Sequence, residues 1–315
     1  MKKIIAVLTT FFIIIGIIFV VLGNTNNNTQ TTEQITVVTS LFPQYDFVKQ
    51  IGKEKVNVQI LLPPGAESHT YEPTPKDIVN INDADMFIFT SDVMEPWADK
   101  IANSIDSDTV ILQAAKNIDL IEMEHHHEGE NEQEKEHEAH KYDSHVWLNP
   151  QYAIKMVENI TEELCKISPE NAEYFRDNAK AYIEELKKLD EEIEGTIANS
   201  KRNKLVFGGE FAYIYFIERY GLEHATAYDG CGEGAEPSVA KIKHIVDTIK
   251  GEQIPVIFYQ ELSTGKIANM IADETNAKAL VFHTVHNVAS EDLENGVTYI
   301  ALMKDNLENI KQALN

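Results

Sequence analysis

Four short segments of this chain carry a histidine or a carboxylate; three of them directly follow a stretch that is typical of a buried strand, and the one at 143–150 closes a histidine-rich loop and opens a helix. The segments and their candidate residues are 63–75 (His69), 143–150 (His145), 207–213 (Glu210) and 280–287 (His283 and His286). When strands alternate with helices, the strands form a mostly parallel sheet whose binding loops gather at the carboxyl ends. We therefore expect these side chains to converge on one cleft.

Three imidazoles and one carboxylate form a four-coordinate set that suits zinc, with ligand distances of about 2.0–2.2 Å. We take the metal ligands to be His69, His145, Glu210 and His283, with His286 as the alternative to His283. Manganese remains possible, although it prefers more oxygen ligands. A zinc hydrolase needs an open position for water, which four protein ligands would fill. We therefore predict metal binding and no catalytic residue.

Nearby carboxylates could orient these ligands from outside the metal shell. Asp143 lies two residues before His145 and is a candidate acceptor for an imidazole N–H, the contact that fixes the tautomer of a metal-binding histidine. Glu261 could also approach the site and is interpreted as an alternative or outer-shell residue. Glu236 and Asp229 are interpreted as outer-shell or structural residues.

Residues 121–143 depart from the rest of the chain, because they contain eight Glu, two Lys and five of the eleven histidines. Such a segment has too little apolar surface to fold by itself, and clustered imidazoles bind metals. We predict a mobile acidic loop that captures metal. Its histidines are His125, His126, His127, His137 and His140.

The amino terminus is typical of an export segment. Lys2 and Lys3 precede a charge-free apolar run, residues 4–22, which is followed by a polar linker to residue 34. The run approaches the roughly 20 residues needed to span a bilayer. We expect an extracytoplasmic protein tethered to the membrane by this run, the alternative being cleavage and release. No cysteine follows it to accept a lipid.

The composition restricts the partners. The chain has 27 Lys and Arg against 51 Asp and Glu, a formal charge of −24, so we do not expect it to bind nucleic acid. Nine of the acidic residues lie in 121–143, so much of the excess is local. Cys165 and Cys231 are too few for a cysteine zinc site, and whether they pair is left open.

Apolar runs alternate with helical stretches in two series, which predicts an α/β protein with two lobes, each built on a mostly parallel sheet flanked by helices. Apolar residues at helical spacing in 169–199 predict one long rigid helix between them. We expect an N-terminal lobe over 35–168, a linking helix over 169–200 and a C-terminal lobe over 201–315, after residues 1–34. The predicted strands are 35–39, 56–62, 86–89, 110–112, 205–207, 225–228, 256–259 and 279–282, and the predicted helices include 45–51, 75–81, 96–105, 151–167, 211–220, 239–249 and 267–275.

These residues together resemble the zinc and manganese solute-binding proteins of bacterial ABC importers. The resemblance covers residue 35 to the carboxyl end. It rests most strongly on segments 63–75, 143–150, Tyr-x-x-Phe-x-x-x-Tyr-Gly-Leu over 213–222, Glu-Pro-Ser over 236–238, and 296–303. It implies two α/β lobes joined by one long helix, a metal held in the cleft between them, and delivery of that metal to a membrane permease.

The resemblance also implies ligands. The family's first two metal histidines fall on His69 and His145. The third ligand, His in zinc-type members and Glu in manganese-type members, falls on Glu210, and the fourth, usually Asp, falls on His283. The acidic histidine-rich loop is similar to that of zinc members, so we expect Zn²⁺ to be the transported ligand. Relatives have been called adhesins, which makes surface adhesion an alternative function.

Overall fold

The computed structural model describes residues 34–105, 108–122, 142–228, 230 and 236–315. The predicted export run 4–22, all five histidines of the capture loop, Asp229 and Cys231 lie outside the described residues. Within the described part of the chain, no helix is both long and apolar enough to cross a bilayer. Gln34–Asn315 form one compact unit, and the lobe boundaries stated above remain predictions.

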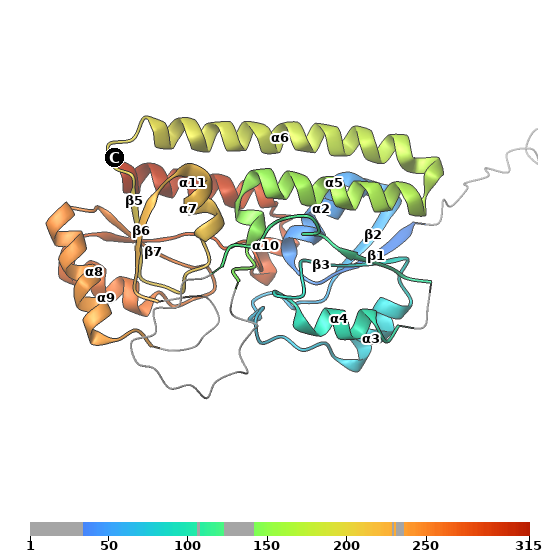
Figure 1. Ribbon diagram of the computed structural model, residues 1–315, viewed down its shortest axis with the longest axis horizontal. Coiled ribbons are helices and arrows are strands. Elements are labelled where there is room, and N and C mark those ends of the chain that lie inside the picture. Colours follow the sequence, from blue (N-terminus) through green and yellow to red (C-terminus); the bar gives the residue numbers. More distant parts are fainter. Residues whose placement is uncertain (1–33, 106–107, 123–141, 229, 231–235) are drawn as a thin grey trace, which may run out of the picture. The chain divides into compact units, whose positions relative to one another are not determined.

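The first sheet has four parallel strands in the order β2-β1-β3-β4. All four residues of β3 are buried, as expected for a strand covered on both faces. Helix α2 packs on one face, and α3 and α4 pack on the other (Figure 1). The elements are β1 (Ile35–Thr39), α2 (Phe42–Gly52), β2 (Val56–Ile60), α3 (Pro75–Asn82), β3 (Met86–Phe89), α4 (Pro96–Ala102) and β4 (Val110–Gln113).

The second sheet repeats this arrangement, with four parallel strands in the order β6-β5-β7-β8. Helices α8 and α9 cover one face, and α7 and α11 lie on the other (Figure 1). The elements are β5 (Lys204–Phe207), α7 (Ile214–Tyr220), β6 (Glu223–Thr226), α8 (Val239–Glu252), β7 (Val256–Tyr259), α9 (Lys266–Thr275), β8 (Lys278–Val281), α10 (Ser290–Glu294) and α11 (Tyr299–Leu314).

Two long helices connect the sheets. Helix α5 (Pro150–Ile167) starts at Asn149, whose side chain accepts a hydrogen bond from Gln151 N, and it packs along α6 (Ala172–Ala198). With 27 residues, α6 is about 40 Å long. It passes over α5 and α11 and so extends along both halves (Figure 1). The predicted fold class, two parallel sheets with helices and one long linking helix, is confirmed.

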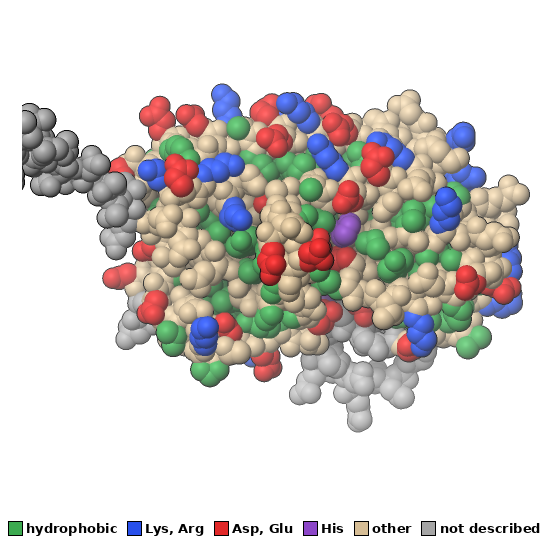
Figure 2. All heavy atoms as spheres, turned by 180° about the vertical axis from the view of Figure 1, so that it is seen from behind, with side chains coloured by type: hydrophobic (Ala, Val, Ile, Leu, Met, Phe, Trp, Pro, Cys, Tyr) green, Lys and Arg blue, Asp and Glu red, His purple; other side chains and the backbone are tan. Residues whose placement is uncertain are grey.

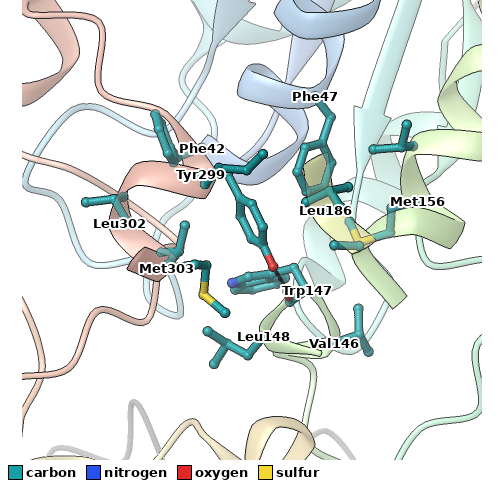
Figure 3. Packing of buried hydrophobic residues seen from close by; sticks show 14 of the residues in the cluster. Phe42, Phe47, Val146, Trp147, Leu148, Met156, Leu186, Tyr299, Leu302 and Met303 are labelled. Carbon is teal, nitrogen blue, oxygen red and sulfur yellow. Dashed lines mark hydrogen bonds between the residues drawn. The ribbon is translucent and has the colours of Figure 1, made fainter. Parts of the chain in front are cut away.

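The main hydrophobic core is continuous between the two sheets. It joins Phe47 of α2 with Phe258 of β7 through side chains of α5, α6 and α11. At its centre Trp147 lies beside Tyr299, whose hydroxyl donates a hydrogen bond of 2.5 Å to the Trp147 carbonyl (Figure 3). The Trp147 indole donates in turn to the carbonyl of Thr284, at 2.8 Å. A shared core restricts how far the two halves can separate.

Of the boundaries that differ from the sequence prediction, two have a clear physical reason. Helix α7 starts at Ile214 rather than at residue 211, because Phe211, Ala212 and Tyr213 enter the core first and the Tyr213 ring stacks on Phe207 at 4.7 Å. Aromatic packing here overrides helix propensity. Strand β6 lies two residues earlier than predicted, since polar residues are acceptable on an edge strand.

Basic and acidic side chains are intermixed over the face of the molecule drawn in Figure 2. Most ion pairs of the described residues are exposed, for example Lys187 with Glu184 and Lys311 with Glu308. Such pairs stabilise a protein little. Asp190 of α6, by contrast, is buried, and its carboxylate accepts hydrogen bonds from Arg219, Gln151 and Tyr220 at 2.6, 2.6 and 2.7 Å.

Replacing Asp190 with Asn should lower the free energy of unfolding by about 1–3 kcal/mol, because Arg219 loses its charged partner. Burial raises the pKa of Asp190, but its three hydrogen bonds and Arg219 hold that pKa below the ordinary value overall. Its contribution is therefore present above the unfolded-state pKa of about 4 and is lost as the pH falls further. Urea unfolding at pH 7 and pH 3 measures both effects.

The matched control is Asp247→Asn, which removes an exposed partner of Lys243 on α8. This change should leave the unfolding curve unaltered. Equal effects of the two substitutions would contradict the importance assigned to Asp190.

Candidate metal centre

Three imidazole rings from three separate segments meet near the carboxyl ends of the strands. His69 lies in the loop between β2 and α3, His145 precedes the short 3₁₀ helix Val146–Leu148, and His286 follows β8. Their ring centroids are 5.2 Å apart for His69 and His145, and 6.2 Å apart for His286 and each of the others. His145 and His286 are 2% and 6% exposed, and His69 is half-buried.

This spacing is close to that of imidazoles sharing one metal ion. Two rings that bind tetrahedral zinc through nitrogens at about 2.1 Å have centroids roughly 5 Å apart. The His69–His145 pair has this spacing, and the two pairs with His286 would have to shorten by about 1 Å. Among the described residues, no three His, Cys, Asp or Glu side chains form a finished coordination group. Small movements of the imidazole rings would therefore be needed to complete the coordination group.

Asp143 fixes the orientation of His145. Its Oδ1 accepts hydrogen bonds from the His145 peptide nitrogen, at 2.8 Å, and lies 3.0 Å from His145 Nδ1. A carboxylate oxygen is only an acceptor, so Nδ1 carries the proton and Nε2 keeps its lone pair. His145 Nε2 is buried and has no hydrogen-bond partner among the described residues. A buried lone pair of this kind is ready to bind a cation.

His286 is oriented through a hydroxyl group. Its Nδ1 lies 2.7 Å from Thr284 Oγ1, and that hydroxyl donates its only proton to Glu261 Oε1 at 2.6 Å. Thr284 must therefore accept from His286 Nδ1–H, which again leaves the lone pair on Nε2. Both buried histidines thus have the tautomer in which Nε2 binds a metal.

The backbone at this point is strained and is held by Glu261. Val285, between Thr284 and His286, has a φ of +64°, which is an outlier for a β-branched residue. The Glu261 carboxylate accepts hydrogen bonds from the peptide nitrogens of Thr284 and Val285, at 2.7 and 3.1 Å. These bonds keep the turn in the conformation that aims His286 at the other rings.

The electrostatic setting favours neutral imidazole. Burial, together with the neighbouring His145 and His69, holds the pKa of His286 well below its ordinary value. Burial raises the pKa of Glu261, although its hydrogen bonds from Thr284 oppose that change. Because a metal binds only unprotonated imidazole, the low pKa of His286 keeps this ring available.

The loop that carries His69 is rigid at both ends. At its start, Pro64 and Gly65 form a turn closed by the hydrogen bond from Ala66 N to Pro63 O, and Gly65 has a φ of +79°, which favours glycine. At its end, Thr74 and Asp77 form the capping box of α3. The peptide nitrogen of His69 donates to the Glu67 carboxylate at 3.1 Å.

The structure does not group the other two predicted ligands with the three rings. Glu210 follows β5, and its carboxylate accepts a hydrogen bond from Gln260 Nε2 at 3.3 Å. It is not in the first turn of a helix, because α7 starts four residues later. His283 is half-buried, and Asn306 of α11 holds its peptide group through two hydrogen bonds. Glu236 pairs with Lys266 at the surface.

Sequence reasoning missed Thr284, whose hydroxyl orients His286, and Asn287, whose side chain donates hydrogen bonds to the carbonyls of Pro63 and Ala66 in the loop that carries His69. Threonine and asparagine are common in loops, so their residue types gave no signal. The only indication was their position within two residues of a histidine after a strand. Asp143 and Glu261, which were proposed as outer-shell residues, contact His145 directly and His286 through Thr284.

The family model described as zinc-uptake complex component A, periplasmic (ZnuA), matches residues 37–313. The chain is 38% identical over 283 residues to the high-affinity zinc uptake system protein ZnuA of Bacillus subtilis, covering 90% of this chain and 88% of that protein. Both comparisons extend over the two sheets and the linking helices.

Solved structures of similar proteins have the same fold as this chain. The Zn(II)-bound ZnuA-like domain of Streptococcus pneumoniae AdcA is 30% identical, with a TM-score of 0.75, and the match covers 89% of this chain and 99% of that domain. The match spans 57% of full-length AdcA. The laminin-binding protein Lmb of Streptococcus agalactiae, described as bifunctional with adhesin and metal transporting activity, is 27% identical, with a TM-score of 0.76, over 89% of this chain and all of that one.

The hydrogen bonds predict that His145 and His286 both carry their proton on Nδ1 in the metal-free protein. Long-range ¹H–¹⁵N NMR spectra of histidine-labelled protein near neutral pH would show this tautomer for both rings. Thr284→Val removes the acceptor of His286 alone, so it should change the signals of His286 and leave the tautomer of His145 intact. An Nε2–H pattern for either ring in the unmodified protein would contradict the assignment.

Proposed function

Because this chain belongs to the family of the zinc-uptake component A, we propose that it captures Zn²⁺ outside the cytoplasm and delivers it to the membrane permease of an ABC importer. Zinc is here the cargo of the protein. The observation that carries this function is the meeting of three imidazoles, His69, His145 and His286. The hydrogen bonds of His145 and His286 put the proton of each ring on Nδ1 and leave the lone pair on Nε2.

We favour His286 over His283 as the ligand from the last strand end. The His286 ring lies near both other histidine rings, and the residue is buried. His283 lies three residues earlier, with its peptide group fixed to α11 by Asn306. The geometry therefore supports His286, the alternative that the sequence had left open.

Glu210 is our proposal for the fourth ligand. It follows the carboxyl end of β5 and is half-buried. Burial, and then the negative charges of Glu236 and Glu210, raise the pKa of the nearby Tyr228 hydroxyl. A carboxylate added to three imidazoles gives a four-coordinate set with a partly neutralised charge. Three nitrogen ligands favour zinc over manganese, which prefers oxygen.

The anchor and the partner remain proposals of their own. The apolar run at residues 4–22 is the proposed tether, and the family name supports a location outside the cytoplasm.

Surface adhesion is a second candidate function, favoured by the similarity to Lmb. Binding of immobilised laminin by metal-stripped protein, with its four ligands replaced, would support it, and loss of all laminin binding would count against it.

Replacing His69, His145 or His286 with Ala should each weaken zinc binding by more than about 100-fold, because loss of an outer-shell partner alone costs about 10–100-fold. Competition with a fluorescent zinc chelator measures the affinity. The matched control is His283→Ala, which should stay within about threefold of the unmodified protein. A large loss in His283→Ala, with His286→Ala unaffected, would reverse the choice between them.

Deleting residues 124–140 should leave the high-affinity zinc site intact, since the three rings come from other segments. The acidic loop is proposed to raise the local metal concentration, so the deletion should reduce zinc capture only at low metal. Stopped-flow association rates and equilibrium affinity separate these effects. Loss of the high-affinity site would instead make the loop a direct ligand donor.

A further inference from the structure

Residues 286–288 belong to the C-terminal half by sequence, yet each of them also makes a hydrogen bond to the N-terminal half. The His286 carbonyl accepts a hydrogen bond from Phe42 N at 3.2 Å. The Val288 carbonyl accepts one from Gly65 N at 3.0 Å. Between them, Asn287 is 1% exposed and directs its side chain toward the loop that carries His69.

The Asn287 side-chain amide is hydrogen-bonded to both ends of the turn that starts this loop. Its Nδ2 donates to Pro63 O at 2.9 Å and to Ala66 O at 2.8 Å, the first and last residues of the turn. Its Oδ1 accepts from Val288 N at 2.8 Å. Both amide protons are therefore used, and the bonds join positions more than 200 residues apart in the chain.

The two residues before His286, Thr284 and Val285, are instead hydrogen-bonded to the C-terminal half. Thr284 and Val285 are held by Glu261, which follows β7 in the second sheet. Val285, with its positive φ, is the point at which the chain passes from one set of contacts to the other. Trp147, from the N-terminal half, adds its bond to the Thr284 carbonyl.

We propose that Asn287 is a positioning residue that fastens His286 to the N-terminal half, so that His69, His145 and His286 form one unit. This inference rests on the proposed function, and it deepens it. Glu210 is then the ligand supplied by the second sheet. Zinc release would then need only a displacement of Glu210 and the strand end that carries it, while the three imidazoles stay together.

An asparagine suits this position because it offers two donors and one acceptor in one plane. Asp at this position would keep the acceptor for Val288 N but would set a carboxylate against two carbonyl oxygens. Ala would remove every side-chain bond. Both changes should free the start of the His69 loop from the His286 segment.

The test compares unmodified protein with Asn287→Ala, Asn287→Asp and Asn309→Ala. Asn309 is the matched control, because its Nδ2 also donates to a main-chain carbonyl, that of Val281, at 2.9 Å. Three quantities are measured: zinc affinity by chelator competition, the visible absorption spectrum of the Co²⁺-loaded protein, and the thermal unfolding midpoint without metal.

We expect both Asn287 variants to lose about 10–100-fold in zinc affinity and to change the Co²⁺ spectrum, which reports ligand geometry. Asn309→Ala should keep its zinc affinity within about threefold of the unmodified protein and should keep the Co²⁺ spectrum. Its unfolding midpoint should change by about as much as that of the Asn287 variants. Unchanged affinity and spectrum in both Asn287 variants would overturn the proposal. So would failure of both variants to fold, since Asn287 would then maintain the fold instead of placing a ligand.

His145→Ala separates this inference from the proposed function. If the unmodified protein did not bind zinc, the function itself would fail. If it bound zinc, and only His145→Ala lost binding while the Asn287 variants did not, the function would stand and the role of Asn287 alone would fall.

Discussion

The indole of Trp147 is the contact on which both buried histidines depend. It lies two residues after His145, with the ring centroids 5.4 Å apart, and its Nε1 donates to the carbonyl of Thr284, two residues before His286. Its own carbonyl accepts from Tyr299, at the start of the last helix. Separating the halves here would expose a fully buried indole, which costs on the order of 2–3 kcal/mol in apolar surface alone. A small displacement near the metal centre is therefore easier than a wide separation of the two halves.

Burial makes the imidazoles good ligands only because their second nitrogen is hydrogen-bonded. An unpaired polar group in a protein interior is costly, so each buried ring needs a defined acceptor. His145 uses a carboxylate directly, and His286 reaches one through the hydroxyl of Thr284. The same Glu261 carboxylate holds the strained peptide group of Val285. Strain at this turn is thus tied to the orientation of one ligand, as is common at functional sites.

The regular elements could be predicted because they obey simple periodicities. The apolar runs that became β1, β3 and β7 are buried on both faces, and the stripe in α6 repeats with helical spacing. Prediction failed at residues 211–213, where buried aromatic rings delay the start of α7. Local preferences cannot account for such packing, because one partner ring of Tyr213 is that of Phe282, which follows β8 and is far away along the chain.

The sequence by itself determined the chemistry: which segments carry imidazoles and carboxylates, and that three of these segments follow the carboxyl ends of strands. The tertiary structure decided which of two histidines, three residues apart, faces His69 and His145. That choice depends on the positive φ of Val285 and on bonds from Glu261, and no spacing rule gives the direction of a side chain in an irregular turn. The tie from Asn287 to the His69 loop likewise exists only after folding, because it joins residues more than 200 positions apart.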